Sequence, residues 1–172
     1  MKTLVTVVLI SFLAFGCKQS SNTKSESNST QAVLSAPEFD SSSTSQELKT
    51  KTQSLIKKID DLSLEATKKQ KIVSLFNLEE APATLWYTED GTLLKIECAS
   101  AGESGNINAI ISYYFVDGDL WYSDQVFAKY IFEEDRLQFW LDEQWNINQI
   151  PSENMKSRER IIQEQVEVLT SN

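Results

Sequence analysis

The apolar positions of this chain repeat with one period in residues 46–77 and with another from residue 84 onward. In 46–77 the apolar residues form two series. Within each series they are separated by seven residues or a multiple of seven, and the two series are offset by four, which is the spacing of an amphipathic helix. The first series is Leu48, Leu55, Leu62 and Phe76, and the second is Ile59, Ala66 and Val73. A coiled coil shares this spacing, but Thr52 and Lys69 interrupt it, so we expect a helix packed on a sheet.

This N-terminal helical region is either one helix or two. Asp60-Asp61 marks the candidate break, and Ser63 is a candidate N-cap for a second helix because Glu65 follows it. Lysines flank the apolar stripe on both sides. They either keep the helix soluble or contact anionic lipid headgroups, and we favour the first interpretation.

From residue 84 the apolar residues alternate with polar ones, which is typical of β-strands. Asp-Gly pairs at 90–91 and 117–118 separate these alternating runs and are strong hairpin signals. Successive hairpins without helical crossovers predict an antiparallel meander. We expect strands over 84–88, 92–99, 107–116, 120–132 (bent or split near Asp124-Gln125) and 136–145.

A last apolar stripe predicts a C-terminal helix after Pro151-Ser152. Its members are Met155, Ile162, Val166 and Leu169. The fold class is therefore α+β: an N-terminal amphipathic helix, or two, packed on a meander of four to five antiparallel strands, with a C-terminal helix. We expect residues 46–172 to form this single domain.

The chain begins with the pattern of a secretory signal. Lys2 precedes an apolar run over 4–15, and Gly16 precedes Cys17. The run is too short to span a bilayer permanently. The sequence Ala14-Phe15-Gly16-Cys17 resembles the lipobox of bacterial lipoproteins, in the looser form found in Bacteroidetes and spirochaetes. The resemblance implies that residues 1–16 are removed and that Cys17 carries acyl chains such as palmitate, which anchor the protein in the cell envelope.

Two alternatives to lipidation stay open. Ala14-Phe15-Gly16 also fits an ordinary signal peptidase site, which would leave Cys17 as a free thiol or allow a Cys17–Cys98 disulfide. In the second alternative, the apolar run over 4–15 is not cleaved and stays on the protein as a membrane anchor.

Strand alternation assigns Cys98 to the core. Leu94, Ile96 and Cys98 are expected on one face of their strand, with Lys95 and Glu97 on the other. A reactive thiolate needs a cationic neighbour, commonly histidine, and the chain contains no histidine. Cys98 is therefore expected to be a small buried apolar residue.

Residues 17–45 are expected to be the lipidated cysteine and a disordered tether. Seventeen of the 28 residues in 18–45 are Ser, Thr, Asn or Gln, which bury too little apolar area to offset the entropy of ordering. In the enterobacterial lipoproteins that this segment resembles, an aspartate beside the cysteine is the usual mark of retention in the inner membrane. Lys18 stands there instead, so we prefer the outer membrane or cell surface. The layout resembles uncharacterised small lipoproteins of Bacteroidetes, which implies no particular activity.

Charge is distributed unevenly along the chain, whose net charge is −9. Residues 46–77 carry seven lysines and four acidic residues, whereas 79–145 carry fourteen acidic and three basic residues. The second region would repel phosphate, so nucleic acid is not expected as a partner.

Sites for a metal, a cofactor or catalysis are not expected either. Without histidine, zinc, copper and haem sites have few ligands available, and the acidic turns lack the spacing of an EF-hand. Solvated turns that protect strand edges are the favoured interpretation over calcium binding. A small carboxylate hydrolase is an alternative function, and it requires a buried pair of acids among Asp124, Glu133 and Asp142.

Aromatic residues are dense in the predicted strands. If the sheet is covered on one side only, some of them form an exposed binding surface for a sugar or a protein partner; otherwise they are a second layer of core under the C-terminal helix. The favoured function is a membrane-anchored, non-catalytic binding or accessory module that engages an envelope protein through a sheet face or edge, and the alternative is a glycan-binding module. The candidate surface residues are Trp86, Tyr114, Trp121, Tyr130 and Trp140.

Overall fold

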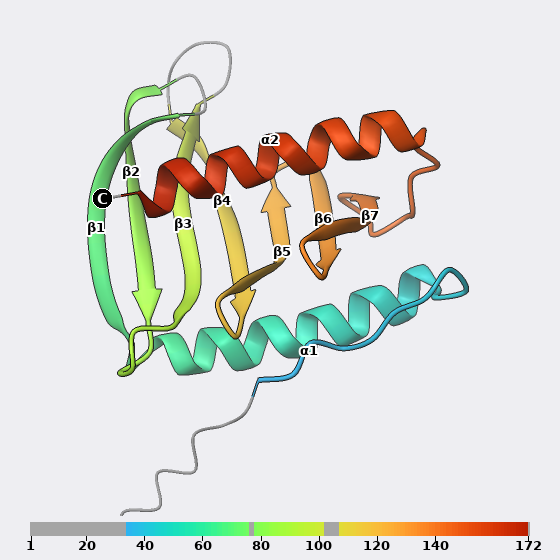
Figure 1. Ribbon diagram of the computed structural model, residues 1–172, viewed down its shortest axis with the longest axis horizontal. Helices are drawn as coiled ribbons and strands as arrows, with labels where there is room; N and C mark the ends of the chain where they lie inside the picture. Colours follow the sequence, from blue (N-terminus) through green and yellow to red (C-terminus); the bar gives the residue numbers. More distant parts are fainter. Residues whose placement is uncertain (1–33, 76–77, 102–106, 172) are drawn as a thin grey trace, which may run out of the picture. The chain divides into compact units, whose positions relative to one another are not determined.

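The computed structural model describes residues 34–75, 78–101 and 107–171. In these ranges the chain forms two helices and seven strands (Figure 1). They are α1 (Ser45–Ser63), β1 (Thr67–Leu75), β2 (Leu78–Tyr87), β3 (Leu93–Ala101), β4 (Ile107–Val116), β5 (Asp119–Gln125), β6 (Ala128–Glu133), β7 (Arg136–Asp142) and α2 (Ser152–Thr170). The signal segment, Cys17 and Phe76 lie outside the described residues.

The strands form a single sheet in chain order, from β1 at one edge to β7 at the other, and each strand is antiparallel to the next. The predicted α+β class, the antiparallel meander and the C-terminal helix are confirmed. The predicted size of four to five strands is wrong, because the described residues form seven. The chain adds β1 and the first half of β2 before residue 84, and it splits 120–132 into β5 and β6 around Val126 and Phe127.

The predicted helix over 46–77 is correct only as far as Ser63. The Ser63 hydroxyl donates to the carbonyl of Ile59 at 2.7 Å in the last turn, so Ser63 does not start a second helix. The following chain runs as β1 beside β2, with Val73 opposite Ala81. The seven-residue repeat continued past the helix because Ala66 and Val73 satisfy it by coincidence, and neither glycine nor proline marks the end of α1.

The two helices cover opposite faces of the sheet. Successive residues of β4 alternate between two core clusters: Tyr113 packs with residues of α2, and Tyr114 packs with residues of α1. The α1 stripe is buried through Leu48, Leu55 and Ile59, and the α2 stripe is buried through Ile162 and Leu169. α2 contacts both β1 and β7, so it crosses the sheet from edge to edge (Figure 1).

Two β-bulges change which residues share a face. A register shift in the β2–β3 pair leaves Leu94 without a partner, and one in the β4–β5 pair does the same to Trp121. Both side chains consequently pack in the α1-side core. The predicted common face of Leu94, Ile96 and Cys98 is therefore wrong for Leu94, whereas Ile96 and Cys98 lie together on the α2 side.

Candidate functional site

The five candidate aromatic residues do not form one exposed surface. Tyr114, Trp121 and Tyr130 are buried, and Trp86 and Trp140 are half-buried. They also divide between the two faces, since Trp86, Tyr114 and Trp121 pack on the α1 side, while Tyr130 and Trp140 pack on the α2 side. Arg158 of α2 lies over the Tyr130 and Trp140 rings, at 5.8 and 5.1 Å from their centroids. All five residues therefore pack into the two core layers beneath the helices.

The three acids of the hydrolase hypothesis are not brought together. Asp124 lies on the α1 side of the sheet, where it forms an ion pair with Lys129 at 3.5 Å. Asp142 pairs across the strands with Ala128, which packs on the α2 side, and Glu133 is exposed at the β6–β7 turn. In the described ranges, no group of three or more acidic or cysteine side chains is arranged to hold a metal ion.

Lys95 is a buried cation that the sequence pattern did not single out. Its Nζ donates to Asp60 Oδ1 at 2.7 Å and to Glu97 Oε1 at 2.8 Å. It also lies over the rings of Trp86 and Tyr114, at 5.4 and 5.1 Å from their centroids. Burial alone would lower the pKa of Lys95, but the hydrogen bonds to Asp60 and Glu97 outweigh it and raise the pKa above its usual range. The cluster around Lys95 joins α1 to β2, β3 and β4. The Lys95 ammonium is the cation that its two carboxylates bind.

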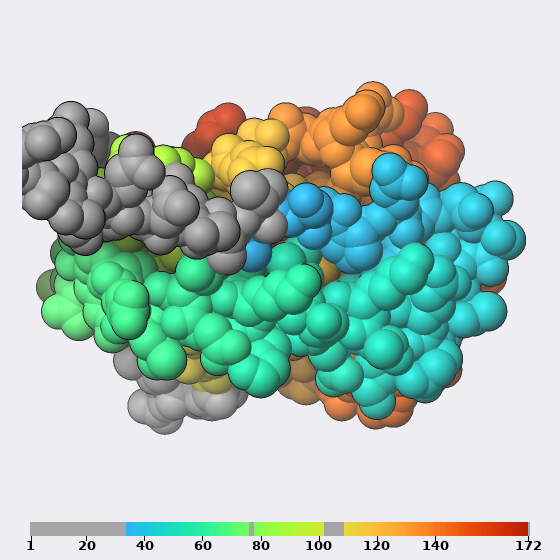
Figure 2. All heavy atoms as spheres, turned by 90° about the horizontal axis from the view of Figure 1, so that it is seen from below, coloured from blue at the N-terminus to red at the C-terminus, as the bar shows by residue number. Residues whose placement is uncertain are grey.

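Residues 34–44, which composition assigned to the tether, form a strap that lies along α1 (Figure 2). Leu34 is buried in the α1-side core, and Phe39 meets Phe139 of β7 edge-on, with ring centroids 6.1 Å apart. The strap thus carries apolar side chains into the same core that α1 covers. Leu34 and Phe39 are visible in the sequence as apolar residues that could dock on the domain, but the serine-rich composition around them favoured a linker.

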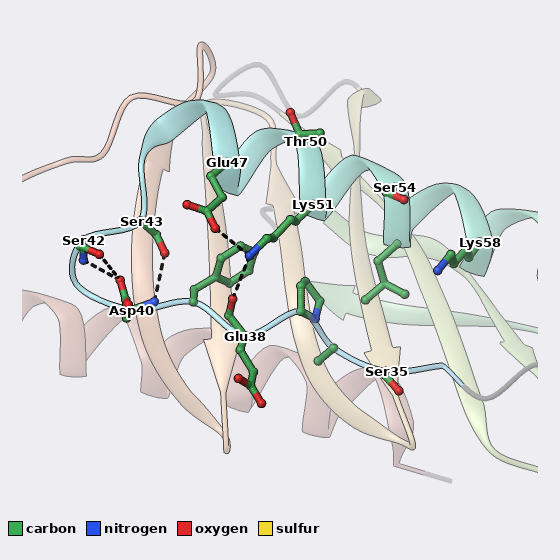
Figure 3. A pocket seen from close by; sticks show the side chains of 14 residues that line it. Ser35, Glu38, Asp40, Ser42, Ser43, Glu47, Thr50, Lys51, Ser54 and Lys58 are labelled. Atoms are coloured by element: carbon green, nitrogen blue, oxygen red, sulfur yellow. Dashed lines mark hydrogen bonds and ion pairs between the residues drawn. The ribbon is translucent and has the colours of Figure 1, made fainter.

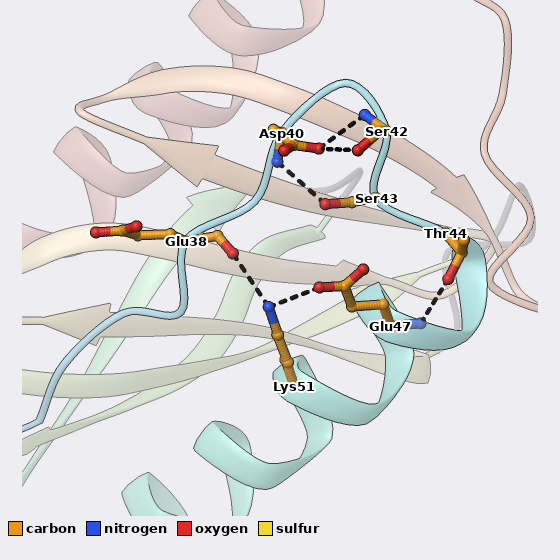
Figure 4. Close-up of polar contacts among 7 residues, drawn as sticks. All are labelled: Glu38, Asp40, Ser42, Ser43, Thr44, Glu47 and Lys51. Carbon is orange, nitrogen blue, oxygen red and sulfur yellow. Dashed lines mark hydrogen bonds and ion pairs between the residues drawn. The ribbon is translucent and has the colours of Figure 1, made fainter.

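Polar contacts close the strap onto the start of α1 (Figure 4). The Asp40 carboxylate accepts hydrogen bonds from the backbone N–H and the hydroxyl of Ser42, at 2.8 and 2.7 Å, and these bonds lower the pKa of Asp40. Lys51 donates to the Glu38 carbonyl at 3.4 Å and pairs with Glu47 at 2.6 Å. Glu47 also gives its backbone N–H to the Thr44 hydroxyl that caps α1.

Two of the grooves that border the strap differ in their lining. The larger, of about 910 Å³, lies between the strap and α1, and its polar lining includes Lys51 and Lys58 (Figure 3). The smaller, of about 480 Å³, lies between the strap and the turns of β4–β5 and β6–β7, with Trp121 among its apolar residues. The buried polar side chains left without a partner in the described ranges, Thr52 and Ser123, line neither groove. Neither groove is therefore lined by one of these unpartnered buried polar side chains.

The two edges of the sheet differ. The outer side of β7 is closed by the following chain: Leu141 pairs with Ile147, and the N–H of Asn148 donates to the Trp140 carbonyl at 2.9 Å. β1 lies at the opposite edge, and within the part of the chain that the structure describes it pairs with β2 alone (Figure 1). An edge strand of this kind offers unpaired backbone N–H and C=O groups. The edge of β1 is the candidate functional surface.

No family model, curated protein or solved structure matches this chain. Its function must therefore be argued from its own residues. In the ranges described, neither helix is long and apolar enough to cross a membrane.

Proposed function

We propose that this chain is a lipid-anchored, non-catalytic binding module of the bacterial cell envelope, which engages a protein partner through the free edge of β1. The observation that carries the binding role is the contrast between the surfaces of the sheet. Helices cover both faces and residues 146–148 close the edge at β7, whereas the described residues leave β1 open. Backbone pairing at a free edge is a common way to bind an extended peptide.

The anchoring role rests on the N-terminal sequence. The charged start, the short apolar run and Gly16-Cys17 support export, cleavage before Cys17 and acylation of its thiol. The outer membrane or the cell surface is the proposed destination, because Lys18 follows the cysteine. The alternative glycan-binding and hydrolase functions are not proposed, since the aromatic residues are buried or half-buried on two different faces and the candidate acids lie apart.

Mass spectrometry of the mature N-terminus tests the anchor. We expect a protein that starts at Cys17 and carries acyl chains, and that sediments with membranes of the native cell. A Cys17→Ser variant should be released into the soluble fraction. A freely soluble native protein, with Cys17 unmodified or joined to Cys98, would contradict the proposal.

Site-specific crosslinking in the native envelope tests the binding role. A photo-reactive residue in place of Gln70, which is exposed in β1, should crosslink to an envelope protein. The same residue in place of Ser157, exposed on α2, is the matched control and should give no such product. Equal crosslinking from both positions, or crosslinking from Ser157 alone, would place the partner elsewhere.

A further inference from the structure

From the charge and register of β1 we infer that its partner is an acidic, extended segment of another protein, which adds to the sheet as a further strand beside β1. This inference deepens the proposed binding role and is independent of the lipid anchor. It rests on three lysines within four residues of one strand: Lys68, Lys69 and Lys71.

The three lysines of β1 have no carboxylate partner among the residues that the structure describes. Lys68 and Lys69 are exposed, and in the described residues none of the three lysines forms an ion pair. Lys69 instead lies 4.7 Å from the centroid of the Tyr87 ring, and Lys71 donates to the Ser171 carbonyl at the end of α2. The free edge therefore combines unpaired backbone groups with uncompensated positive charge, which acidic side chains on an added strand would neutralise.

The register defines where those acids would lie. Lys69 and Lys71 are two positions apart and lie on the α2 side of the sheet, as their contacts with Tyr87 and Ser171 show. Lys68 and Ile72 lie on the opposite side, and Ile72 is 62% exposed. A complementary strand therefore carries two acidic residues separated by one position on its α2 side. It carries an acidic and an apolar residue on the other side.

A second copy of this chain is a poor occupant. Antiparallel pairing of two β1 strands about Gln70 would set Lys69 opposite Lys71, and pairing about Lys71 would set two copies of that lysine face to face. Like charges directly opposite each other destabilise a strand pair. The chain's own N-terminal residues are also unsuitable, because residues 1–33 contain three lysines and a single glutamate.

The test measures binding of synthetic peptides to the mature chain carrying Cys17→Ser, by fluorescence anisotropy. The probe is a peptide in which glutamate alternates with valine, and its control replaces every glutamate with lysine. Two further versions of the probe are N-methylated, each on one set of alternate amides. In an added strand only one set donates to β1, so one methylated version should bind about tenfold more weakly and the other should bind normally.

Charge-reversal variants test the role of the lysines. The triple variant Lys68→Glu, Lys69→Glu, Lys71→Glu should bind the glutamate probe about tenfold more weakly, because the cross-strand ion pairs of Lys69 and Lys71 are replaced by repulsion and Lys68 no longer adds positive charge to the edge. The matched control reverses Lys49, Lys57 and Lys58 of α1, which changes net charge equally and should alter affinity about twofold or less. The methylated probes need no change in the protein, so they decide the question even if a variant fails to fold.

Three outcomes would overturn the inference: no binding of the glutamate probe, equal binding of the lysine peptide, or equal binding of both methylated versions. The last would indicate charge attraction without strand pairing. These results are separable from failure of the proposed function. A crosslink from Gln70 to an envelope protein together with no probe binding would refute only the acidic strand. Absence of that crosslink with specific probe binding would refute only the envelope partner.

Discussion

Replacing Lys95 separates the energetic roles of its charge and of its aliphatic stem. The side chain of Lys95 is only 11% exposed, whereas those of its partners Asp60 and Glu97 are 42% and 38% exposed. Both carboxylates would regain water if the ammonium were removed. We therefore expect Lys95→Met, which keeps an unbranched apolar side chain in the same space, to be much milder than Lys95→Ala.

The magnitudes follow from the contacts. Lys95→Ala removes the γ, δ and ε methylene groups, since alanine keeps the β carbon; at about 0.8 kcal/mol for each buried methylene, the loss is about 2.4 kcal/mol. Each solvent-screened ion pair contributes about 0.2–1 kcal/mol, and each contact with the Trp86 or Tyr114 ring about 0.5–1 kcal/mol. Since methionine retains contact with both rings, Lys95→Met should cost about 1–2 kcal/mol and Lys95→Ala about 4 kcal/mol.

Urea unfolding of wild type, Lys95→Met and Lys95→Ala, compared at equal m-value, measures these differences in the free energy of unfolding.

The stability that the Lys95 charge contributes depends on pH in a defined direction. Burial alone would lower the pKa of Lys95, but the hydrogen bonds to Asp60 and Glu97 raise it above the ordinary 10.5. The charge therefore contributes its full stability below pH 10.5 and loses it as pH rises through the folded pKa. The difference between wild type and Lys95→Met should be constant between about pH 6 and 9.

Equal destabilisation by Lys95→Met and Lys95→Ala would refute this reasoning, because it would mean that the charge rather than the stem dominates. A double-mutant cycle with Asp60→Asn checks the pair directly. We expect a coupling energy of about 1 kcal/mol or less, given the exposure of Asp60. A coupling of several kcal/mol would show that solvent does not screen the pair.

Three further predictions concern the core and the strap. Burial raises the pKa of Cys98 to about 11 from 9.0, so a thiol reagent should modify Cys98 only after unfolding, and rapid labelling of the native protein would contradict this. The stability that the buried, protonated thiol contributes should be lost as pH rises from about 9 to 11. Ile162→Ala, at a fully buried position of α2, should lower the free energy of unfolding in urea by about 2–5 kcal/mol, whereas Ile161→Ala, at the exposed neighbouring position, should lower it by under about 1 kcal/mol. Similar values for the two variants would show that α2 does not cover the sheet. Phe39→Ala should cost about 1–2 kcal/mol and speed proteolytic cleavage within residues 34–44, and an unchanged cleavage rate would mean that the Phe39–Phe139 contact does not hold the strap.

Local patterns were sufficient for much of the secondary structure. The α2 stripe at Ile162 and Leu169 and the hairpin at Asp117-Gly118 follow from residues near one another in the chain, where period and turn chemistry act directly. The burial of Cys98 also followed from alternation within one strand. For 64–75 the same reasoning failed, because Ala66 and Val73 continue the helical spacing of seven by coincidence, whereas in the structure they pack on opposite faces of the sheet.

The free edge could not be read from the sequence for the same reason. Lys68, Lys69 and Lys71 look like the solvated side of a helix until β1 is known to pair with β2. The burial of Lys95 and the division of the candidate aromatic residues between two faces likewise required knowledge of the strand register.

The sequence by itself determined the α+β class, the antiparallel meander, the C-terminal helix and the apolar stripe of the N-terminal helix as far as Ser63. Only the tertiary structure decided that β1 is a strand, that bulges turn Leu94 and Trp121 toward α1, and that the strap packs on the domain. The physical reason is that periodicity reflects interactions between near neighbours in the chain. Strand pairing and the face that a side chain occupies depend instead on residues far away in sequence.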